Sequence, residues 1–275
     1  MYIVETDSTN NLLKAAVAEE AAWLHEERIP VVWTGFQTAG RGQAGNGWES
    51  EQGKNLLFSL LLRQPPVPVE KQFLISMLAA VALWDTVAET IGKEGLTIKW
   101  PNDLYWGDKK LAGMLIENTL SGSGIAYSII GIGLNINQEQ WIGNAPNPVS
   151  MRLITGKTYS PEQVLTRYMT LLEAWLQRPQ SEWRSAYMQH LYRREGWWRF
   201  VEREVSLTPT MNAQTTDGGF LARIEGITEQ GELILKKENN ETKTYHFKEI
   251  RYILWPLLSS PVAPALLAAT LLGYL

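Results

Sequence analysis

The sequence predicts an α+β protein with a mixed, mainly antiparallel sheet and helices on one side, followed by a small C-terminal β-barrel. Three strand-like segments, 96–100, 111–119 and 125–137, are separated only by turns, which indicates an antiparallel meander. After residue 197 the pattern changes to short strands between glycine-containing turns, which is typical of a small barrel. A chain of 275 residues is long enough for one large and one small domain.

Helix, strand and turn signals place the remaining elements. Ser8 or Thr9 can cap a first helix, and Ser160-Pro-Glu-Gln163 is a capping box with proline at the first helical position. The helices are expected over residues 10–27, 69–91, 161–177 and 182–194. The further strands are expected over 29–37, 56–62, 201–207, 220–227, 232–237 and 242–248. These limits give a larger domain (1–196), a small β-barrel domain (197–255) and an apolar tail (256–275).

Composition excludes several classes of function. The net charge of −4 argues against a protein that binds nucleic acid through bulk electrostatic attraction. The absence of cysteine excludes disulfides, thiolate nucleophiles and cysteine-ligated zinc, and it fits a reducing compartment such as the cytoplasm. The histidines at positions 25, 190 and 246 lack the spacing of metal ligands, so no protein-borne metal site is expected.

Neither end of the sequence predicts membrane insertion. The N-terminal residues lack the basic and apolar regions of a signal peptide. The apolar stretch 253–275 is interrupted by Pro256, Pro261 and Pro264, and the remainder is shorter than the about 20 residues of a membrane span. We expect this tail to pack on the body of the protein or on a partner.

Residues 40–48, Gly-Arg-Gly-Gln-Ala-Gly-Asn-Gly-Trp, contain the G-x-G-x-x-G pattern of dinucleotide-binding loops. That pattern binds a pyrophosphate only where a helix follows, because the helix N-terminus supplies the donors. Here another strand follows, and the acidic residue about 20 positions on in a βαβ unit is missing, which disfavours a nicotinamide-dependent oxidoreductase. We expect a loop that closes over an anionic ligand and carries one arginine, Arg41.

Two polar motifs stand beside the ends of predicted elements. Asp7-Ser8-Thr9-Asn10 can be simply a helix cap, but it offers more donors and acceptors than one cap uses and could bind a urea or amide group. Lys99-Trp-Pro-Asn-Asp103 fits a strand followed by a turn. A turn does not explain a lysine at the end of an apolar strand, so Lys99, Asn102 and Asp103 could face a nucleotide or a metal.

Two further motifs place glycine inside strands. Lys110-Leu-Ala-Gly113 can be an exposed strand start, but a glycine within a strand often marks the close approach of a ligand or another backbone. Gly131-Ile-Gly133-Leu-Asn135 has two glycines in an apolar strand. These glycines leave a slot where a flat ring could lie against the backbone.

In this order, the five motifs resemble those of biotin–protein ligases, over roughly residues 5–140. The resemblance continues more loosely through the small barrel, and it implies a class II synthetase-like catalytic domain with an SH3-like barrel. Such ligases join biotin to ATP, giving biotinyl-5′-AMP and pyrophosphate. They then transfer biotin to a lysine of the biotin carboxyl carrier domain of a biotin-dependent carboxylase, typically acetyl-CoA carboxylase.

The resemblance implies a role for each motif residue. The biotin carboxylate is itself the nucleophile, so the site needs cations and Mg²⁺ to stabilise charge on the phosphorus. The implied catalytic residues are Lys110, Arg41 and Lys99, with Lys110 between the biotin carboxylate and the α-phosphate. The implied biotin-binding residues are Ser8, Thr9, Asn10, Gln37, Gly40, Arg41, Lys110, Gly113, Leu115, Gly131 and Gly133. The implied ATP-binding or adenylate-binding residues are Arg41, Gln43, Trp48, Lys99, Asn102, Lys110 and Asn135, with Trp48 over the adenine.

The chain departs from the family pattern at two places. Many relatives carry several arginines in the glycine-rich loop, where this chain has Gln43, Ala44 and Asn46, which puts the tightness of adenylate retention in doubt. The first motif begins at residue 7, which leaves no room for the N-terminal helix-turn-helix of ligases that double as repressors. We therefore expect no nucleic-acid partner and no membrane association, and either a monomer or a homodimer.

Two other functions remain open. A lipoate–protein ligase resembles this fold and chemistry, but the Gly-Arg-Gly loop, the Lys-Trp-Pro-Asn-Asp motif and the attached barrel favour biotin. A non-catalytic biotin sensor is disfavoured by the presence of Arg41, Lys99 and Lys110 together, and a repressor is disfavoured because no N-terminal helix-turn-helix is expected.

Overall fold

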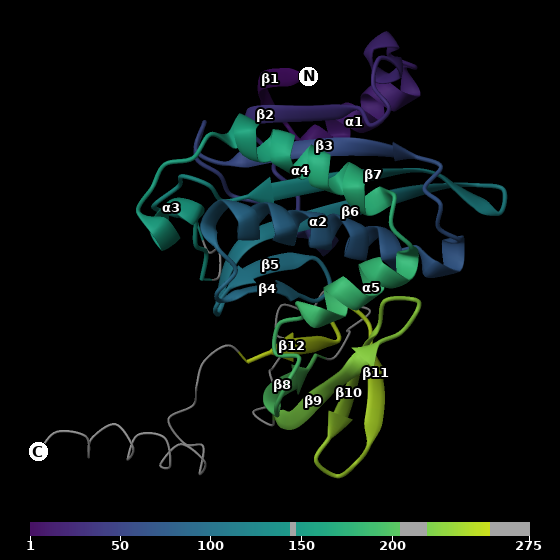
Figure 1. Cartoon of the computed structure of the whole chain (residues 1–275), viewed down its shortest axis with the longest axis vertical. Helices are drawn as coiled ribbons and strands as arrows, with labels where there is room; N and C mark the ends of the chain where they lie inside the picture. The colour runs from purple at the N-terminus through teal and green to yellow at the C-terminus, as the bar shows by residue number, and fades with distance from the viewer. Residues whose placement is uncertain (144–146, 204–218, 254–275) are drawn as a thin grey trace, which may run out of the picture.

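The computed structural model describes residues 1–143, 147–203 and 219–253. The strands of its first sheet are β1 (Tyr2–Thr6), β2 (Val31–Gln37), β3 (Leu56–Arg63), β4 (Leu96–Lys99), β5 (Asp103–Trp106), β6 (Lys109–Ser121) and β7 (Gly124–Leu134). They form a seven-stranded sheet in the order β1-β2-β3-β7-β6-β5-β4 (Figure 1). β1 is parallel to β2 and every other neighbouring pair is antiparallel. The mixed sheet confirms the predicted α+β class.

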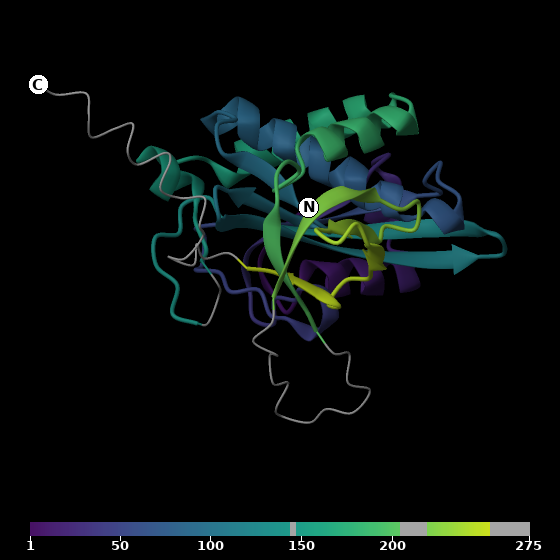
Figure 2. The ribbon, with the colours of Figure 1, turned by 90° about the horizontal axis from the view of Figure 1, so that it is seen from below.

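Helices cover both faces of this sheet. They are α1 (Thr9–Ala18), α2 (Phe73–Ile91), α3 (Met151–Thr155), α4 (Pro161–Leu176) and α5 (Gln180–Gln189). The helices α2, α4 and α5 lie on one face, as predicted, whereas α1 lies on the opposite face (Figure 2). Phe58 and Leu60 of β3 join the core beneath α2, and Leu61 packs with Leu13 and Ala16 of α1. Because β3 is covered on both faces, its sequence is almost continuously apolar instead of alternating between apolar and polar residues.

Helix α2 is the centre of the larger core. In the part of the chain that the structure describes, it is the one helix long and apolar enough, by length and composition, to cross a membrane. However, 67% of the apolar window is buried inside the protein, against α4, α5 and the sheet. A helix that is apolar all round is equally typical of the core of a large domain.

The strand register places three glycines together on the α1 face. Gly131 of β7 pairs with Ser59 of β3, and Gly133 of β7 pairs with Gly113 of β6. Ile130 and Ile132 enter the core beneath α2. Because side chains alternate along a strand, positions 131 and 133 face the other way, toward α1. The glycines therefore leave a trough in the α1 face of the sheet.

A second, five-stranded sheet forms the small domain. Its strands are β8 (Trp198–Glu202), β9 (Phe220–Ile227), β10 (Leu233–Lys237), β11 (Thr242–Tyr245) and β12 (Ile250–Tyr252). They are antiparallel in the order β11-β10-β9-β8-β12. In a flat sheet β11 and β8 would be about 14 Å apart. The Tyr245 hydroxyl nevertheless donates a hydrogen bond to Glu202 at 2.6 Å, so the sheet curls as a small barrel does.

The small domain is attached beside the turn between β4 and β5. The indole Nε1 of Trp100, in that turn, donates to the carbonyl oxygen of Gly231 at 2.8 Å. Arg184 of α5 donates to the carbonyl oxygens of Ile227 and Thr228 at the end of β9. The Trp100 bond ties the small domain to the Lys-Trp-Pro-Asn-Asp motif, and the Arg184 bonds tie it to α5.

Gly231→Ala is expected to lower the free energy of unfolding by about 2 kcal/mol or more. Gly231 has a φ of +95°, and an added Cβ would lie 2.5 Å from Phe73 Cγ. Urea unfolding measures the change, with Gly226→Ala as a matched control because its Cβ would meet only Ile234 Cδ1 at 3.9 Å. Equal midpoints for the two variants would contradict this account of the domain junction.

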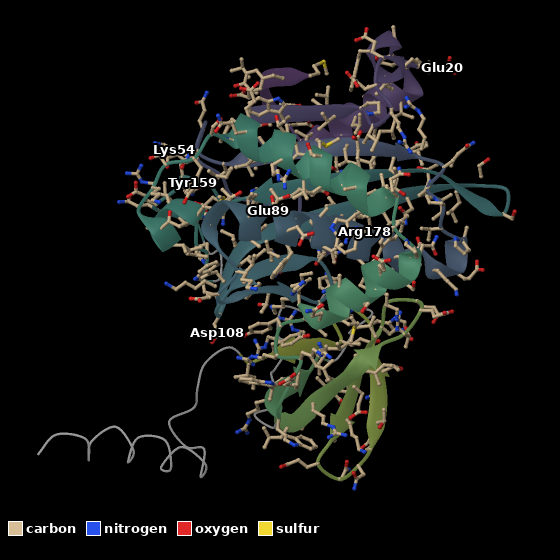
Figure 3. The ribbon with its side chains drawn as sticks, viewed as in Figure 1. Glu20, Lys54, Glu89, Asp108, Tyr159 and Arg178 are labelled. Carbon is tan, nitrogen blue, oxygen red and sulfur yellow. The ribbon has the colours of Figure 1, made fainter. Side chains whose placement is uncertain are left out.

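Several predicted limits were wrong. The first helix ends at Ala18 rather than at 27, because Glu20 (Figure 3) has a φ of +51° and a separate 3₁₀ turn, Ala22–His25, follows. That turn returns Leu24 to the same core, which explains the misleading helical spacing. The strand predicted over 201–207 begins at Trp198 and ends at Glu202. Residues 204–207 and the tail 256–275 lie outside the described residues.

The strands β1, β5 and β12 and the helix α3 were not predicted. Each is at most five residues long, and at that length apolar spacing carries little information. β5 lies within the segment between residues 100 and 111, where the sequence predicts only a turn. Its pairing with both β4 and β6 extends the meander by one strand.

Candidate functional site

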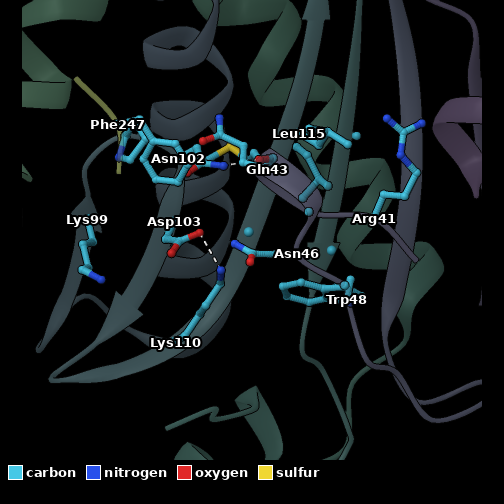
Figure 4. A pocket seen from close by; sticks show the side chains of 18 of the residues that line it. Arg41, Gln43, Asn46, Trp48, Lys99, Asn102, Asp103, Lys110, Leu115 and Phe247 are labelled. Atoms are coloured by element: carbon cyan, nitrogen blue, oxygen red, sulfur yellow. Dashed lines mark hydrogen bonds and ion pairs between the residues drawn. The ribbon is translucent and has the colours of Figure 1, made fainter. Parts of the chain in front are cut away.

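A cavity of about 400 Å³ opens on the α1 face of the large sheet (Figure 4). Its walls come from the start of α1, the loop 40–48, the β4–β5 turn, β6, β7 and the small domain. The predicted site residues that line it are Ser8, Thr9, Asn10, Gln37, Arg41, Gln43, Trp48, Lys99, Asn102, Lys110, Gly113, Leu115, Gly131 and Gly133. The fold thus brings residues from all five sequence motifs to one cavity.

Two predicted site residues, Gly40 and Asn135, do not line this cavity. A Cβ on Gly40 would lie 2.5 Å from the carbonyl oxygen of Trp48, so glycine there lets the loop close on itself. The Asn135 side chain donates to the carbonyl of Val149 at 3.1 Å and lines a smaller adjoining cavity with Trp48 and Lys110. Its buried Oδ1 has no hydrogen-bond partner among the described residues, which leaves an acceptor beside Trp48.

A buried polar cluster closes one end of the cavity. Gln37 Oε1 accepts hydrogen bonds from the backbone amide and the hydroxyl of Thr9, at 2.8 and 3.1 Å. Ser59 on β3 lies 2.7 Å from the Thr9 hydroxyl. Ser8 is the N-cap residue by position, but its hydroxyl makes no cap hydrogen bond, and the residue lines the cavity. The side-chain cap expected from Ser8 is therefore not made, and the motif instead contributes to the polar end of the cavity.

Two side chains fill the glycine trough. A Cβ on Gly133 would lie 2.4 Å from Trp48 Cε2, and a Cβ on Gly131 would lie 2.0 Å from Asn10 Oδ1. The indole of Trp48 thus lies flat over the space that the glycines leave, and its buried Nε1 has no partner among the described residues. The side chains of Trp48 and Asn10 thus occupy the slot in which the sequence analysis expected a flat ring.

Lys110 lies at the centre of the cavity. Its Nζ is 2.7 Å from Asp103 Oδ1, and the two side chains are 27% and 19% exposed. The backbone of Lys110 is held on β6 by hydrogen bonds with Asn147 and Val149, both at 2.9 Å. Figure 4 shows the Lys110–Asp103 pair between Lys99 on one side and Arg41 on the other. A ligand anion at this point would meet a positioned ammonium group.

Lys99 lies at the end of the cavity nearest the small domain. Its Nζ donates to the Tyr105 hydroxyl at 3.1 Å and lies 4.6 and 5.2 Å from the ring centres of Tyr105 and Tyr252. The pKa of Lys99 is lowered from 10.5 to about 8, mainly because the side chain is buried. The negative charge of Asp103 raises this pKa in part, and the positive charge of Lys110 lowers it further. An anionic ligand would restore the ordinary preference for the charged form.

Arg41 belongs to a charge network at the opposite end. Its guanidinium is 3.0 Å from Glu117 on β6, and the ammonium of Lys14 is 2.6 Å from the same carboxylate. Burial raises the pKa of Glu117, but hydrogen bonds from Lys14 and Asn10 and the charge of Arg41 outweigh it, so its pKa lies below the ordinary value. The carboxylate therefore stays ionised and holds the loop against α1.

The loop 40–48 forms a short hairpin. Arg41 and Gly47 form an isolated antiparallel β-bridge. Two backbone hydrogen bonds flank it: Gly42 N donates to the Asn46 carbonyl at 2.7 Å, and Trp48 N donates to the Gly40 carbonyl at 2.9 Å. Only a 3₁₀ turn, Gln43–Gly45, lies inside it, and the next element is β3. The absence of a following helix confirms that the glycine pattern is not a dinucleotide-binding loop.

The small domain contributes cavity residues that the sequence analysis missed. They are Arg203, Phe247, Lys248, Ile250, Arg251 and Tyr252. They follow the last motif by about 70 residues or more, and no local pattern links them to it. Only the docking of the small domain at Trp100 brings them to the site.

Comparisons with known proteins agree with this geometry. Residues 5–135 match the model of the biotin/lipoate A/B protein ligase family. The biotin–[acetyl-CoA-carboxylase] ligase of Paracoccus denitrificans is 33% identical over 180 residues, which are 63% of this chain and 71% of that protein. The bifunctional ligase/repressor BirA of Bacillus subtilis is 30% identical over 216 residues, 76% of this chain. This chain covers 62% of the length of that relative.

The fold has solved counterparts. The structure of the biotin protein ligase from Aquifex aeolicus in complex with biotin and ATP aligns with a TM-score of 0.66 and 22% identity, over 92% of this chain and 98% of that chain. This likeness shows that the two chains share a fold, a mixed sheet with a small β domain. The chain belongs to the biotin–protein ligase family.

Proposed function

We propose that this protein activates biotin with ATP, forming biotinyl-5′-AMP and pyrophosphate, and then transfers biotin to a lysine of a biotin carboxyl carrier domain. The observation that carries this proposal is the place of Lys110. It lies between a glycine trough that admits a flat ring and a cationic end that suits phosphates, all in one cavity. Family membership and the motif residues along this cavity support the same reaction.

The chemistry needs positioning and charge more than a catalytic base. A carboxylate oxygen of biotin attacks the α-phosphorus, the bond to the β-phosphate oxygen breaks, and pyrophosphate leaves. Lys110 and Lys99 would neutralise the two anions as they approach and stabilise charge on the phosphorus. In the second step the acceptor amine attacks the biotinyl carbonyl carbon, AMP leaves with the bonding electrons, and the amine loses a proton.

The biotin rings are assigned to the α1 end of the cavity. A ureido group offers two N–H donors and one carbonyl acceptor, and the cluster of Ser8, Thr9 and Gln37 offers matching groups. The trough over Gly131 and Gly133 would take the fused rings once the Trp48 indole or the Asn10 amide moves.

Magnesium fits the site as a partner of the nucleotide. Among the described residues that line the cavity, Asp103 is the one carboxylate, and no described group of three His, Cys, Asp or Glu could hold a metal alone. Mg²⁺ is commonly bound by one or two carboxylates together with substrate phosphates. Asp103 would then hold the ion, which would screen the phosphate charge.

The affinity for ATP should fall as the pH rises through about 8, the pKa of Lys99. Below this pH the ammonium is charged and attracts phosphate, whereas above it the neutral amine does not. ATP binding favours the protonated form, so the dissociation constant rises on the alkaline side. Calorimetric titrations one pH unit on either side of about 8 measure the change. Lys99→Gln serves as the control, and identical profiles for the two proteins would contradict this role.

A biotin-dependent ATP–pyrophosphate exchange assay tests the proposed function. Exchange with biotin, and none with lipoate, is the expected result. Exchange that depends on lipoate alone would instead assign a lipoate–protein ligase, and binding of biotin without exchange would assign a sensor.

A further inference from the structure

We propose that Glu117 is a positioning residue that holds the loop 40–48 over the cavity through Arg41, and that this ion pair sets how fast the adenylate escapes. The inference rests on the proposed function and deepens it. It gives Arg41 a task different from the one that the family resemblance implies, because the guanidinium binds the protein rather than the ligand.

The Arg41 side chain is engaged by two acceptors of the protein itself. Its Nη1 donates to Asn11 Oδ1 on α1, and its Nη2 lies 3.0 Å from Glu117 Oε1 on β6. Figure 4 shows the guanidinium of Arg41 pointing away from the Lys110–Asp103 pair, where the two anions would meet. If the guanidinium turned toward a phosphate, it would lose both of these bonds.

Glu117 joins the loop to the fixed part of the site. Its Oε1 lies 2.6 Å from the ammonium of Lys14, and its Oε2 accepts a hydrogen bond from the Asn10 amide at 2.8 Å. Lys14 and Asn10 both belong to α1. Asn11 is held in turn, since its amide donates to Asp7 Oδ2 at 2.7 Å. The loop is therefore tied to a carboxylate and an amide whose own positions are set by other bonds.

The loop offers no second charge that could hold it over an anion. Arg41 is the one charged residue in the segment 40–48. Gln43, which lines the cavity, is neutral, and its buried Oε1 has no hydrogen-bond partner among the described residues. An adenylate in the cavity would contact residues 41–43 and 46–48, which form one of its walls. Its retention would then depend on how firmly this wall stays closed.

Removing the Glu117 carboxylate should free the loop without unfolding the protein. The side chains of Glu117 and Arg41 are 23% and 41% exposed, so solvent screens their attraction and the pair adds little to overall stability. Without the carboxylate, the positive charges of Lys14 and Arg41 would repel each other. An energy of the size typical for such a pair changes the population of an open loop about fivefold.

Limited proteolysis of the ligand-free full chain tests this ion pair without any biotin chemistry. Trypsin cuts after arginine, and it can cut after Arg41 only when the loop opens and releases that side chain. Glu117→Gln should be cut at this bond about fivefold faster than the wild type, and no faster at sites remote from the loop. The matched control is Glu89→Gln, which removes an exposed carboxylate paired with Arg167 outside the cavity lining (Figure 3). This variant should match the wild type.

Release of preformed biotinyl-5′-AMP then relates the loop to the ligand. The dissociation rate should rise about fivefold in Glu117→Gln and in Arg41→Gln, with no further rise when the two changes are combined. If Arg41 instead bound the ligand, the two effects would multiply, and that result would overturn the inference. Unchanged cleavage after Arg41 in Glu117→Gln, or faster cleavage with unchanged release, would overturn it as well.

Failure of the proposed function would show differently. The wild-type chain would then perform no biotin-dependent exchange, whereas the tryptic cleavage after Arg41 would still respond to Glu117→Gln.

Discussion

Lys110→Ala is expected to slow adenylate formation at least about a hundredfold while the protein stays folded. Lys110 is the ammonium at the centre of the cavity, where the carboxylate of biotin and the α-phosphate of ATP would meet. Removing such a preorganised charge exposes the full repulsion between the two anions in a site shielded from water. The loss of the partly exposed pair with Asp103 should itself cost no more than about 1 kcal/mol of stability.

Lys109→Ala is the matched control for this variant. Lys109 is the neighbouring lysine on β6, it is exposed, and it does not line the cavity. Single-turnover formation of the adenylate and thermal unfolding of both variants separate chemistry from folding. Pyrophosphate release by Lys110→Ala at a near-normal rate would remove Lys110 from the catalytic role.

Gly131→Ala is expected to raise the dissociation constant for biotin about tenfold or more, because an overpacked contact costs about 1–3 kcal/mol. The added methyl group would lie 2.0 Å from Asn10 Oδ1. If the Asn10 side chain moves, it loses the hydrogen bond that its amide nitrogen donates to Glu117 at 2.8 Å. The methyl group would therefore displace the Asn10 side chain or occupy the trough.

Gly124→Ala gives the control on the same strand. Its Cβ would meet only the carbonyl oxygen of Ser121, at 3.9 Å, at the far end of β7. Equilibrium titration with biotin alone measures both variants, so ATP chemistry does not enter. Equal biotin affinities for the two variants would show that the trough is not the place of the biotin rings.

Much of the site could be predicted from the sequence because its residues belong to short motifs at strand ends. Gly131 and Gly133 interrupt an apolar strand where glycine costs stability, and they do face the cavity. Lys99 is the last residue of the apolar strand β4. A turn does not require a lysine at this position, whereas a cavity that binds an anion does, and Lys99 lines the cavity. The sequence was informative at positions where the residue type is unusual for its element, such as a glycine inside an apolar strand or a lysine at the end of one.

The rest of the site depends on contacts between distant segments. Arg203 and Arg251 have the pattern of ordinary surface arginines, and only the docking of the small domain brings them to the cavity. The place of α1 on the second face was missed for a related reason. Leu13 packs against Leu61 on the alternate side of β3, and a continuous apolar run does not show which face a helix covers.

The central claim is that this chain makes an acyl-adenylate of biotin in the cavity around Lys110. Mass spectrometry of the products, after incubation of the full chain with biotin and MgATP, tests it most directly. We expect biotinyl-5′-AMP and pyrophosphate in equal amounts with the wild type, and almost none with Lys110→Ala. Formation of ADP and phosphate, or of no nucleotide product at all, would contradict it.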